Sequence, residues 1–525
     1  MAQSSLRYHR IVPGYYVENF GCRATQADGA ALERQFEERG MARATAPSEA
    51  SVVVMNTCTV TASADQDARA AIRRVRRQNP SAQIVVTGCY AQRAPEEIAA
   101  LPGVSLVIGN SHKHQLAQIV SATAIKSSGE SGCADVLDFG WRSASSPAIE
   151  AASHPRALAA EACVFVPLTT LTALPESQEP EAGSPIFVSD IFAHTELLAA
   201  PVFDAANERT RPNLKVQDGC DNRCSFCVIP YVRGHSRSLG IDRILREVNG
   251  LVESGYREVV VSGINLGRWG RDLDCGPQTL DLGQNLAAEV RDPKSEVSFE
   301  HLVRAILSET ALEKLRISSV EPMDWSDELI SLVGSSPRIA KHAHVPMQSG
   351  CDAVLRRMHR KYRPWHYREK IEKIRAAMPT AAIGADVMVG FPGETEAEFE
   401  STRRMIEDLP FTYLHVFTYS ARPGTPAAEM PNQVPVQKAR ERNRVLRELA
   451  AEKKLVFMRS FIGKPVDAIT LNVMGNDGSG EFTEALTDNY LKLRLRGRHE
   501  ANHWLTAQAE DVADGALVGT LAQAL

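Results

Sequence analysis

Three thiols stand close together near the middle of the chain, at Cys220, Cys224 and Cys227. Three and then two residues separate them, a spacing that lets them converge on one metal centre. Four thiolates normally close a [4Fe-4S] cube, so a cube held by three leaves one iron open to another ligand. Zinc also binds thiolates, but its sites are usually paired CxxC units or mixtures of Cys and His. The sequence has no second CxxC, which favours an iron–sulfur centre.

A second set of three cysteines follows three strand-like segments, Tyr15–Phe20, Ser51–Asn56 and Gln83–Thr87. Each segment precedes a helical pattern, and this alternation predicts a parallel sheet with helices on both faces. The carboxyl ends of parallel strands line one ligand crevice. The cysteines just beyond these ends are therefore either a second open metal site or buried structural thiols, since free cysteine is often buried. These cysteines are Cys22, Cys58 and Cys89, and their equivalent positions after successive strands favour the metal site.

The gross properties of the chain fit intracellular metal chemistry. Its 525 residues predict about three domains. Ten cysteines without a secretion signal favour reduced thiols over disulfides. No apolar run reaches the ~18 residues of a membrane helix. We therefore expect a cytoplasmic protein with no membrane partner. The net charge of −5 does not by itself indicate a nucleic-acid partner.

The central region repeats a strand and helix pattern six times. Helical patterns begin near Leu239, Ser298, Ser326, Asp352 and Glu396. Six such units predict an open (β/α)6 partial barrel, with its chemistry at the carboxyl ends of the strands. The expected strands are Asn213–Gln217, Glu258–Ser262, Lys314–Ser318, His342–Pro346, Ala382–Val389 and Tyr413–Tyr419.

The cysteine motif at Cys220–Cys227, with Phe226 before its last thiol, resembles the signature of the radical S-adenosylmethionine (SAM) enzymes. In that family the open iron chelates the amino and carboxylate groups of SAM. One electron then releases a 5′-deoxyadenosyl radical. The resemblance implies that loops after the strands bind SAM. The candidate SAM-binding residues are Phe226, Gly263, Asn265, Ser319, Glu321, Gln348, Gly390 and Gly393.

The N-terminal motifs Gly21-Cys22, Asn56-Thr57-Cys58-Thr59-Val60-Thr61 and Gly88-Cys89-Tyr90 resemble those of the methylthiotransferases. The resemblance implies a flavodoxin-like domain with an auxiliary [4Fe-4S] cluster, whose free iron carries the sulfur to be inserted. Two [4Fe-4S] clusters and SAM are then the expected cofactors.

The remaining segments complete a four-part division into residues 8–124, 125–206, 207–452 and 456–525. The second part is rich in Ala, Ser, Pro and Glu and predicts a linker, with one packed segment at Phe187–Leu198. Strands are expected in the fourth part at Val466–Leu471, Glu481–Leu486 and Asn489–Leu495.

The last of these strands alternates leucine with basic residues. This pattern is expected for a strand of a small barrel whose outer face binds phosphate groups. An ordinary solvated strand has the same pattern. The length and position of the tail resemble the TRAM domain, an RNA-binding barrel. The run Arg356–Arg363, which includes Tyr362, has the composition of an RNA contact or of a solvated helix end.

Together these resemblances imply a tRNA methylthiotransferase. Ser262-Gly263-Ile264-Asn265 is similar to the Thr-Gly-Ile-Asn loop of the branch that acts on N6-threonylcarbamoyladenosine, which lies at position 37 beside the anticodon. The alternatives are isopentenyladenosine in tRNA, a ribosomal-protein aspartate, or a non-catalytic iron–sulfur protein that binds RNA or transfers electrons. The expected partners are the tRNA anticodon loop and an electron donor such as a flavodoxin or ferredoxin. We expect a monomer.

Overall fold

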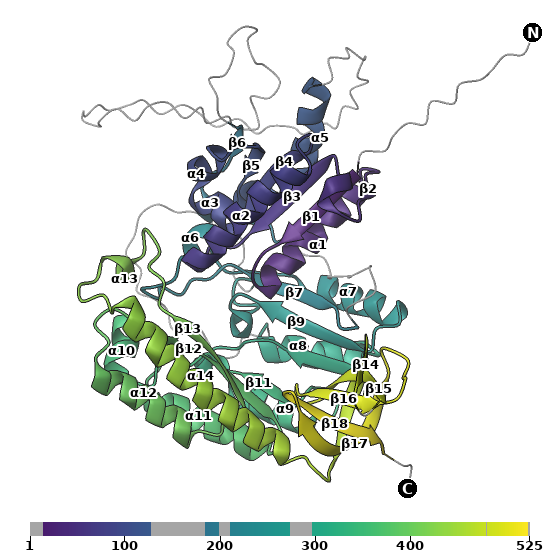
Figure 1. The fold of residues 1–525 in the computed structure, drawn as a ribbon, viewed down its shortest axis with the longest axis vertical. Coiled ribbons are helices and arrows are strands. Elements are labelled where there is room, and N and C mark those ends of the chain that lie inside the picture. The colour runs from purple at the N-terminus through teal and green to yellow at the C-terminus, as the bar shows by residue number, and fades with distance from the viewer. Residues whose placement is uncertain (1–13, 128–183, 199–209, 274–296, 479, 523–525) are drawn as a thin grey trace, which may run out of the picture.

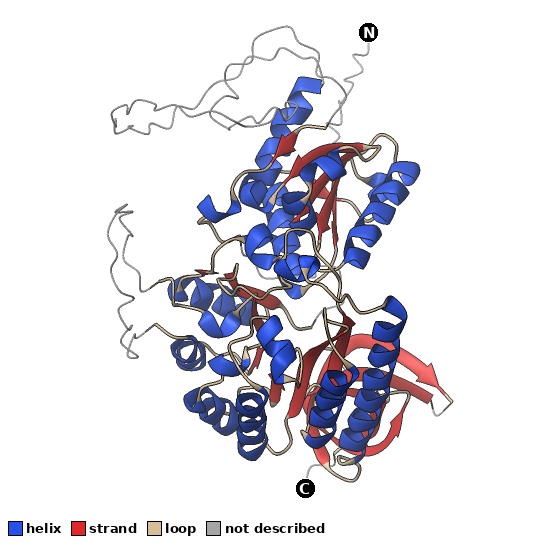
Figure 2. Ribbon diagram, turned by 90° about the vertical axis from the view of Figure 1, so that its left-hand side faces the viewer, coloured by secondary structure: helices blue, strands red, loops and turns tan. Residues whose placement is uncertain are grey.

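The computed structural model describes residues 14–127, 184–198, 210–273, 297–478 and 480–522. An N-terminal domain sits above a larger central region, and a C-terminal barrel packs against the lower edge of that region (Figure 1). Helices cover the outer faces of the sheets (Figure 2). None of the helices in the described ranges combines the length and the apolar character needed to cross a bilayer.

The N-terminal domain is built on a parallel sheet with the strand order β2-β1-β3-β4-β5-β6. The first five strands follow the flavodoxin-like order, and the sixth extends the sheet from the segment expected to be a linker. All six residues of β3 are buried, as expected for a strand covered on both faces. The strands are β1 (Gly14–Asn19), β2 (Ala42–Arg43), β3 (Val52–Thr57), β4 (Gln83–Gly88), β5 (Val104–Ile108) and β6 (Ile186–Phe187).

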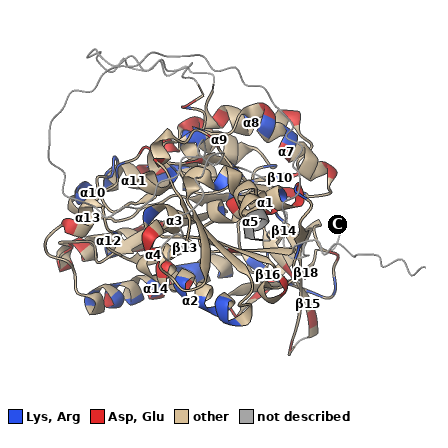
Figure 3. Cartoon of the chain, turned by 90° about the horizontal axis from the view of Figure 1, so that it is seen from above, with Lys and Arg blue, Asp and Glu red and all other residues tan. Residues whose placement is uncertain are grey.

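Helices cover both faces of this sheet and form two separate cores. Val53 and Met55 pack with Ile72 on one face, while Val54 packs with Leu32 on the other. The predicted alternation of strands and helices is confirmed. Figure 3 looks down on this domain and shows basic positions along α2. The helices are α1 (Arg23–Glu37), α2 (Ala62–Gln78), α3 (Cys89–Arg93), α4 (Pro95–Ala99) and α5 (Leu116–Ser127).

The central region holds the six expected strands in two hydrogen-bonded sheets, β10-β9-β7-β8 and β11-β12-β13. A short antiparallel strand, β8, pairs with β7. On the other edge of β10, Leu315 forms an isolated parallel β-bridge with Ile339. The strands are β7 (Asn213–Asp218), β8 (Arg237–Ser238), β9 (Glu258–Gly263), β10 (Lys314–Ile317), β11 (His342–His344), β12 (Ala382–Val389) and β13 (Tyr413–Thr418).

Several helix starts in this region are explained by their caps. Ser298 and Ser326 each accept a hydrogen bond from a backbone N–H in the first turn, as N-cap residues do. Thr395 forms a capping box with Glu398. The helices are α6 (Ile229–Arg233), α7 (Ile241–Glu253), α8 (Phe299–Glu309), α9 (Asp327–Ser335), α10 (Asp352–Arg357), α11 (Pro364–Ala377), α12 (Glu396–Asp408), α13 (Pro426–Glu429) and α14 (Val436–Arg459).

The C-terminal strands close into a barrel in the order β14-β15-β16-β18-β17. Leu493 and Leu495 are buried while Lys492 and Arg496 are exposed, so the predicted alternation is confirmed. Arg494 pairs with an acidic residue, which reduces the positive charge of this wall. The strands are β14 (Pro465–Asp477), β15 (Gly480–Thr487), β16 (Lys492–Arg496), β17 (Trp504–Ala513) and β18 (Ala516–Leu521).

The expected strand start at Asn489 is wrong, because the chain still turns there. The backbone N–H of Leu491 donates to the Thr487 side chain, and Tyr490 adopts the left-handed conformation with φ of 69°. β16 therefore begins at Lys492. The turn places the Tyr490 side chain against the central region.

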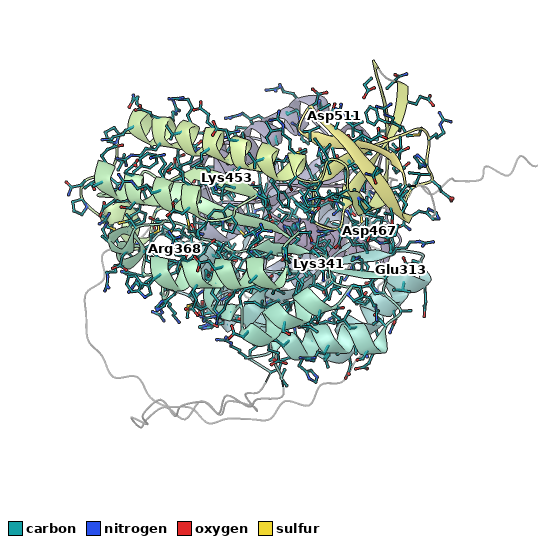
Figure 4. The ribbon with its side chains drawn as sticks, turned by 90° about the horizontal axis from the view of Figure 1, so that it is seen from below. Glu313, Lys341, Arg368, Lys453, Asp467 and Asp511 are labelled. Carbon is teal, nitrogen blue, oxygen red and sulfur yellow. The ribbon has the colours of Figure 1, made fainter. Side chains whose placement is uncertain are left out.

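The same turn fixes the barrel to the central sheets. Arg316, fully buried, forms an ion pair of 2.6 Å with Glu258 and donates to the carbonyl of Asp488. Lys314 pairs with the Asp488 carboxylate at 3.1 Å. Figure 4 shows the molecule from below and labels Lys341 of the central region and Asp467 of the barrel.

A network of buried charges joins the N-terminal domain to the central region. Asp28 of α1 pairs with Lys113 of its own domain at 3.0 Å, and also with Lys215 of β7 and Arg233 of α6. The last two also pair with Asp218, at 2.7 and 2.9 Å. Burial by itself would raise the pKa of Asp28, but the three cations lower it to about 2. This carboxylate is therefore charged at neutral pH.

We expect Asp28→Asn to loosen the contact between the two parts. The substitution leaves three buried cations facing one carboxylate, and breaking a buried pair costs about 3–5 kcal/mol. Hydrogen–deuterium exchange of α1 and β7 measures the loss as faster amide exchange. Asp327→Asn is the control, because its pair with Lys373 is exposed and should not change exchange. Unchanged protection of α1 and β7 would contradict the expectation.

Candidate functional site: two facing cysteine triads

The first triad lies on the loop that follows β7. Gly219 begins the loop with φ of +72°, and a Cβ at this position would lie 1.9 Å from the carbonyl oxygen of His235. Only glycine fits this close approach. Cys220, Cys224 and Cys227 then occupy the turn between β7 and α6, all of them half-buried.

Nitrogen donors surround the thiols of this loop. Arg360 donates to Sγ of Cys224 at 3.2 Å, and the side chain of Asn265 lies 3.8 Å from Sγ of Cys220. Burial raises the pKa of Cys220 to about 11 and that of Cys227 to about 12. Without a metal these two thiols keep their protons at neutral pH, and metal binding displaces those protons.

The second triad is assembled from three loops of the N-terminal sheet. Cys22 precedes α1, Cys58 follows β3 and Cys89 begins α3. Gly21 lies so close to Cys58 that a Cβ at Gly21 would lie 2.9 Å from its Sγ. Burial, together with smaller contributions from the neighbouring Cys89 and Cys22, raises the pKa of Cys58 to about 12. The structure thus brings the three predicted cysteines together.

Hydrogen-bond donors also reach this second triad. The side-chain nitrogen of Asn110 lies 3.6 Å from Sγ of Cys89, and the hydroxyl of Thr25 lies 3.6 Å from Sγ of Cys22. Cys89 and Cys22 both raise the pKa of Arg233, with a larger contribution from Asp218. The Arg233 guanidinium also donates to the hydroxyl of Thr25 at 3.5 Å, and so reaches the Cys22 side of this triad.

The two triads face each other across the boundary between the domains. Cys89 packs against Val228 and Val232 of the central region, and Val228 directly follows Cys227. On the Cys58 loop, the hydroxyl of Thr59 accepts a hydrogen bond of 2.8 Å from Arg422. Two of the three loops of the second triad, those of Cys58 and Cys89, are therefore anchored to the central region.

The chemistry of these donor sets fits iron–sulfur clusters. No three His, Cys, Asp or Glu side chains in the described part of the chain are arranged to hold a single metal ion. A cube is bound differently, because each iron takes one thiolate and three cysteines need not converge on one atom. The amide and guanidinium donors near the sulfurs are the contacts that tune cluster potential.

Three of the residues expected to bind SAM, Phe226, Asn265 and Glu321, lie beside the first triad. Asn265 approaches Cys220, while Ser319 shares a hydrogen bond of 2.7 Å with His344. Glu321 forms an ion pair with Arg360, and Phe226 contacts the ring of Phe391 edge-on. The Oδ1 atom of Asn265 is buried without a hydrogen-bond partner among the described residues. Such an acceptor suits the ammonium group of SAM.

Three more of the expected SAM residues have roles in the backbone of the fold. Gly390 donates to the Glu394 carboxylate at 2.6 Å, and a Cβ on Gly390 would lie 2.6 Å from Ala439. Gly393 adopts φ of +72° in the same turn. Gln348 adopts φ of 62° and bridges to Val387. Their contacts with SAM stay predictions.

The basic run at Arg356–Arg363 lacks the exposed aromatic ring that an RNA contact would use. Tyr362 is 1% exposed, and its hydroxyl donates to backbone carbonyls of the loop after β11, so its ring is not available for stacking. Arg357 pairs with Glu398 and Arg356 with Asp352. The carboxylate that neutralises Arg357 is distant in sequence, whereas the one that neutralises Arg356 lies one helical turn earlier.

Sequence reasoning missed several polar residues that touch the thiols or join the domains. Arg360 belongs to a run interpreted as an RNA contact or a solvated helix end, and nothing in the pattern marks it as a buried member. Asn110 follows β5 of the parallel sheet, at the same edge as the cysteines, so its position could have identified it. The others are Asp28, Lys113, Lys215 and Arg233, single charges within otherwise ordinary segments.

Two family profiles match the chain. The family described as "Uncharacterized protein family UPF0004" matches residues 14–109, and the Radical SAM superfamily matches residues 214–406. These ranges contain the second and the first triad respectively. Among solved structures, the radical SAM methyltransferase TsrM from Kitasatospora setae aligns with a TM-score of 0.50 at 13% identity. The alignment covers 79% of this chain and 77% of TsrM, and it supports the fold alone.

Curated relatives match over nearly the whole chain. The threonylcarbamoyladenosine tRNA methylthiotransferase MtaB of Bacillus subtilis is 32% identical, with 91% of this chain and 90% of the relative covered. The tRNA-2-methylthio-N(6)-dimethylallyladenosine synthase of Novosphingobium aromaticivorans is 31% identical, with 87% and 86% covered. Such identity across both triads shows that the chain belongs to the radical SAM methylthiotransferase family.

Proposed function

We propose that the protein attaches a methylthio group to N6-threonylcarbamoyladenosine at position 37 of tRNA. The observation that carries this proposal is the pair of cysteine triads on facing loops, with Cys89 packed against Val228. Radical generation and sulfur delivery require two separate metal centres near one substrate. A single iron–sulfur centre for electron transfer would not require the second triad.

When bound, the clusters and SAM would supply the radical and the methylated sulfur, as in the family. The residues of this chain hold and shield them. Cys220, Cys224 and Cys227 would bind the cluster that holds SAM, with Asn265 and Glu321 beside it. Cys22, Cys58 and Cys89 would bind the auxiliary cluster. The protein supplies binding, orientation and exclusion of competing reactions around such cofactors.

The choice of substrate is supported by the relatives and by one loop. Several relatives named as threonylcarbamoyladenosine methylthiotransferases are 30–32% identical to this chain. Gly263 and Asn265 of the Thr-Gly-Ile-Asn-like loop lie at the end of β9, beside the first triad. Isopentenyladenosine is the second candidate, because a relative that makes the dimethylallyl product is 31% identical.

We further propose that the four-part division expected from the sequence describes the working parts, with the C-terminal barrel as a TRAM domain that binds tRNA. Its closed five-stranded form and its exposed Lys492 and Arg496 support this role. The flavodoxin or ferredoxin donor, the monomeric state and the cytoplasmic location stay predictions.

Variants of the two triads test the function. Cys58→Ala should remove about four irons per chain and abolish methylthio product, while reduced protein still forms 5′-deoxyadenosine. Cys224→Ala should abolish both. Mass spectrometry of nucleosides, after reaction with tRNA from a deletion strain, identifies the product. Absence of 5′-deoxyadenosine from reduced wild-type protein would contradict the proposal, and a methylthio group on isopentenyladenosine would establish the second candidate.

Gly21→Ala should act on the auxiliary triad alone. The added Cβ would lie 2.6 Å from Cβ of Cys58, at a backbone φ of +98° that disfavours alanine. We expect the variant to lose auxiliary iron and methylthio product while it retains SAM cleavage. Gly250→Ala is the matched control, since a Cβ there meets no neighbouring atom. Full auxiliary iron in the Gly21 variant would refute the proposed closeness.

Arg360→Gln should make the SAM-binding cluster harder to reduce. The substitution removes a positively charged donor 3.2 Å from Sγ of Cys224, and fewer donors at the sulfurs lower a cluster's reduction potential. Electron paramagnetic resonance during a redox titration measures the shift. Arg356→Gln, which removes an exposed pair with Asp352, should leave the potential unchanged. An unchanged potential in the Arg360 variant would rule out this tuning role.

A further inference from the structure

Aromatic and imidazole side chains gather on one face of the central sheet. Tyr413, His415 and Phe417 alternate along β13 and so share one face, and the last two are exposed. His344 of β11 stacks on Tyr413 and contacts His415. Tyr490 of the C-terminal barrel completes the set. We call these five residues the aromatic face.

The aromatic face is held in place from several sides. His342 and the Tyr413 hydroxyl share a hydrogen bond of 2.7 Å. The Tyr413 ring lies over Gly384, where a Cβ would come within 2.0 Å of the ring. His344 hydrogen-bonds to Ser319, a candidate SAM residue, and its other ring nitrogen lies 3.4 Å from Asp386. The face thus reaches the SAM side of the site.

Arg23 connects this face to the auxiliary triad. It directly follows Cys22, and its guanidinium donates to the Tyr490 hydroxyl at 3.3 Å. Its positive charge is also among the causes that lower the pKa of His415, after burial and the neighbouring His344. Arg23 is half-buried, so part of its side chain stays accessible to a ligand.

Arg23 differs from the other cations of this region in having no anionic partner. Lys113, Lys215 and Arg233 all pair with Asp28, and Arg316 pairs with Glu258. Within the described ranges no carboxylate lies at ion-pair distance from Arg23. A partly desolvated guanidinium without an anion is costly, and a carboxylate from a ligand would offset that cost.

We propose that Arg23 binds the carboxylate of the threonylcarbamoyl group and so selects this nucleoside over isopentenyladenosine. The inference rests on the proposed function. Threonine supplies a carboxylate, whereas the isopentenyl group is uncharged and offers no acceptor. The planar guanidinium matches a carboxylate with two parallel hydrogen bonds. The adenine would lie against the aromatic face, between Ser319 on the SAM side and Cys22 on the sulfur side.

The test combines a change in the protein with a change in the substrate. Anticodon stem-loop RNAs carry threonylcarbamoyladenosine, its carboxylate methyl ester or isopentenyladenosine at position 37. Their binding to anaerobically reconstituted, unreduced protein is measured by fluorescence anisotropy. We expect the wild type to bind the free acid about 10- to 100-fold more tightly than the ester, the range of one charged hydrogen-bonded contact. Arg23→Gln should bind both at the ester's affinity.

Arg34→Gln is the matched control, because Arg34 lies on the same helix and pairs at the surface with Glu38. It should keep the full preference for the acid. Arg23→Lys keeps the charge but not the two-pronged geometry, and should keep part of the preference. Tyr490→Phe should weaken acid binding but not ester binding, because it removes only the hydroxyl that orients the guanidinium.

Three results would overturn the inference. The first is a full acid preference in Arg23→Gln. The second is an equal loss of acid and ester binding in that variant at wild-type iron content, which would mean a structural or phosphate-contact role. The third is a wild-type protein that methylthiolates the RNA with the free acid but binds this RNA and the ester RNA equally well. Failure of the wild type to produce any methylthio product would instead refute the proposed function.

Discussion

The relative position of the two triads depends on a set of buried ion pairs. Its carboxylates are Asp28 and Asp218, and its cations are Lys113, Lys215 and Arg233. Apolar surfaces can slide over one another with little loss, because the hydrophobic effect is not directional. Buried ion pairs cannot, because any shift leaves charges without partners in a medium of low polarity. Asp28 belongs to the helix that follows Cys22, and Asp218 lies two residues before Cys220. The network therefore sets the distance between the two cysteine loops directly.

The same network has one more cation than it has carboxylates. Arg233 and Lys113 both interact with the thiol of Cys89, and Arg233 also interacts with that of Cys22. Thiolates bound to iron carry negative charge, so the excess positive charge lies where the auxiliary cluster would be anionic. One set of side chains thus aligns the domains and supplies a compensating field. Because both tasks rest on the same atoms, neither can be altered without the other.

Much of the fold follows from local patterns in the sequence. The alternation of buried strands and helices, the serine caps at Ser298 and Ser326, and the two-residue period of Leu493 and Leu495 all depend on neighbours close in the chain. The cysteines of both triads were found in the same way, from spacing and from position after strands. The surroundings of the thiols were not, because Arg360, Arg233 and Arg23 differ from surface arginines only in what packs around them. Tyr362 shows the converse, since a run that looks exposed hides its aromatic residue.

The turn at Tyr490 has a consequence for how the C-terminal barrel can move. Through this turn the barrel contacts Arg316 of the central region and Arg23 of the N-terminal domain, so one short segment meets all three parts of the molecule. A module that only tethers RNA could swing freely on α14. This one also accepts a hydrogen bond from Arg23, the residue next to Cys22. A displacement of the barrel would therefore shift the chain beside the auxiliary triad, so the position of the barrel and the geometry of that cysteine loop are coupled.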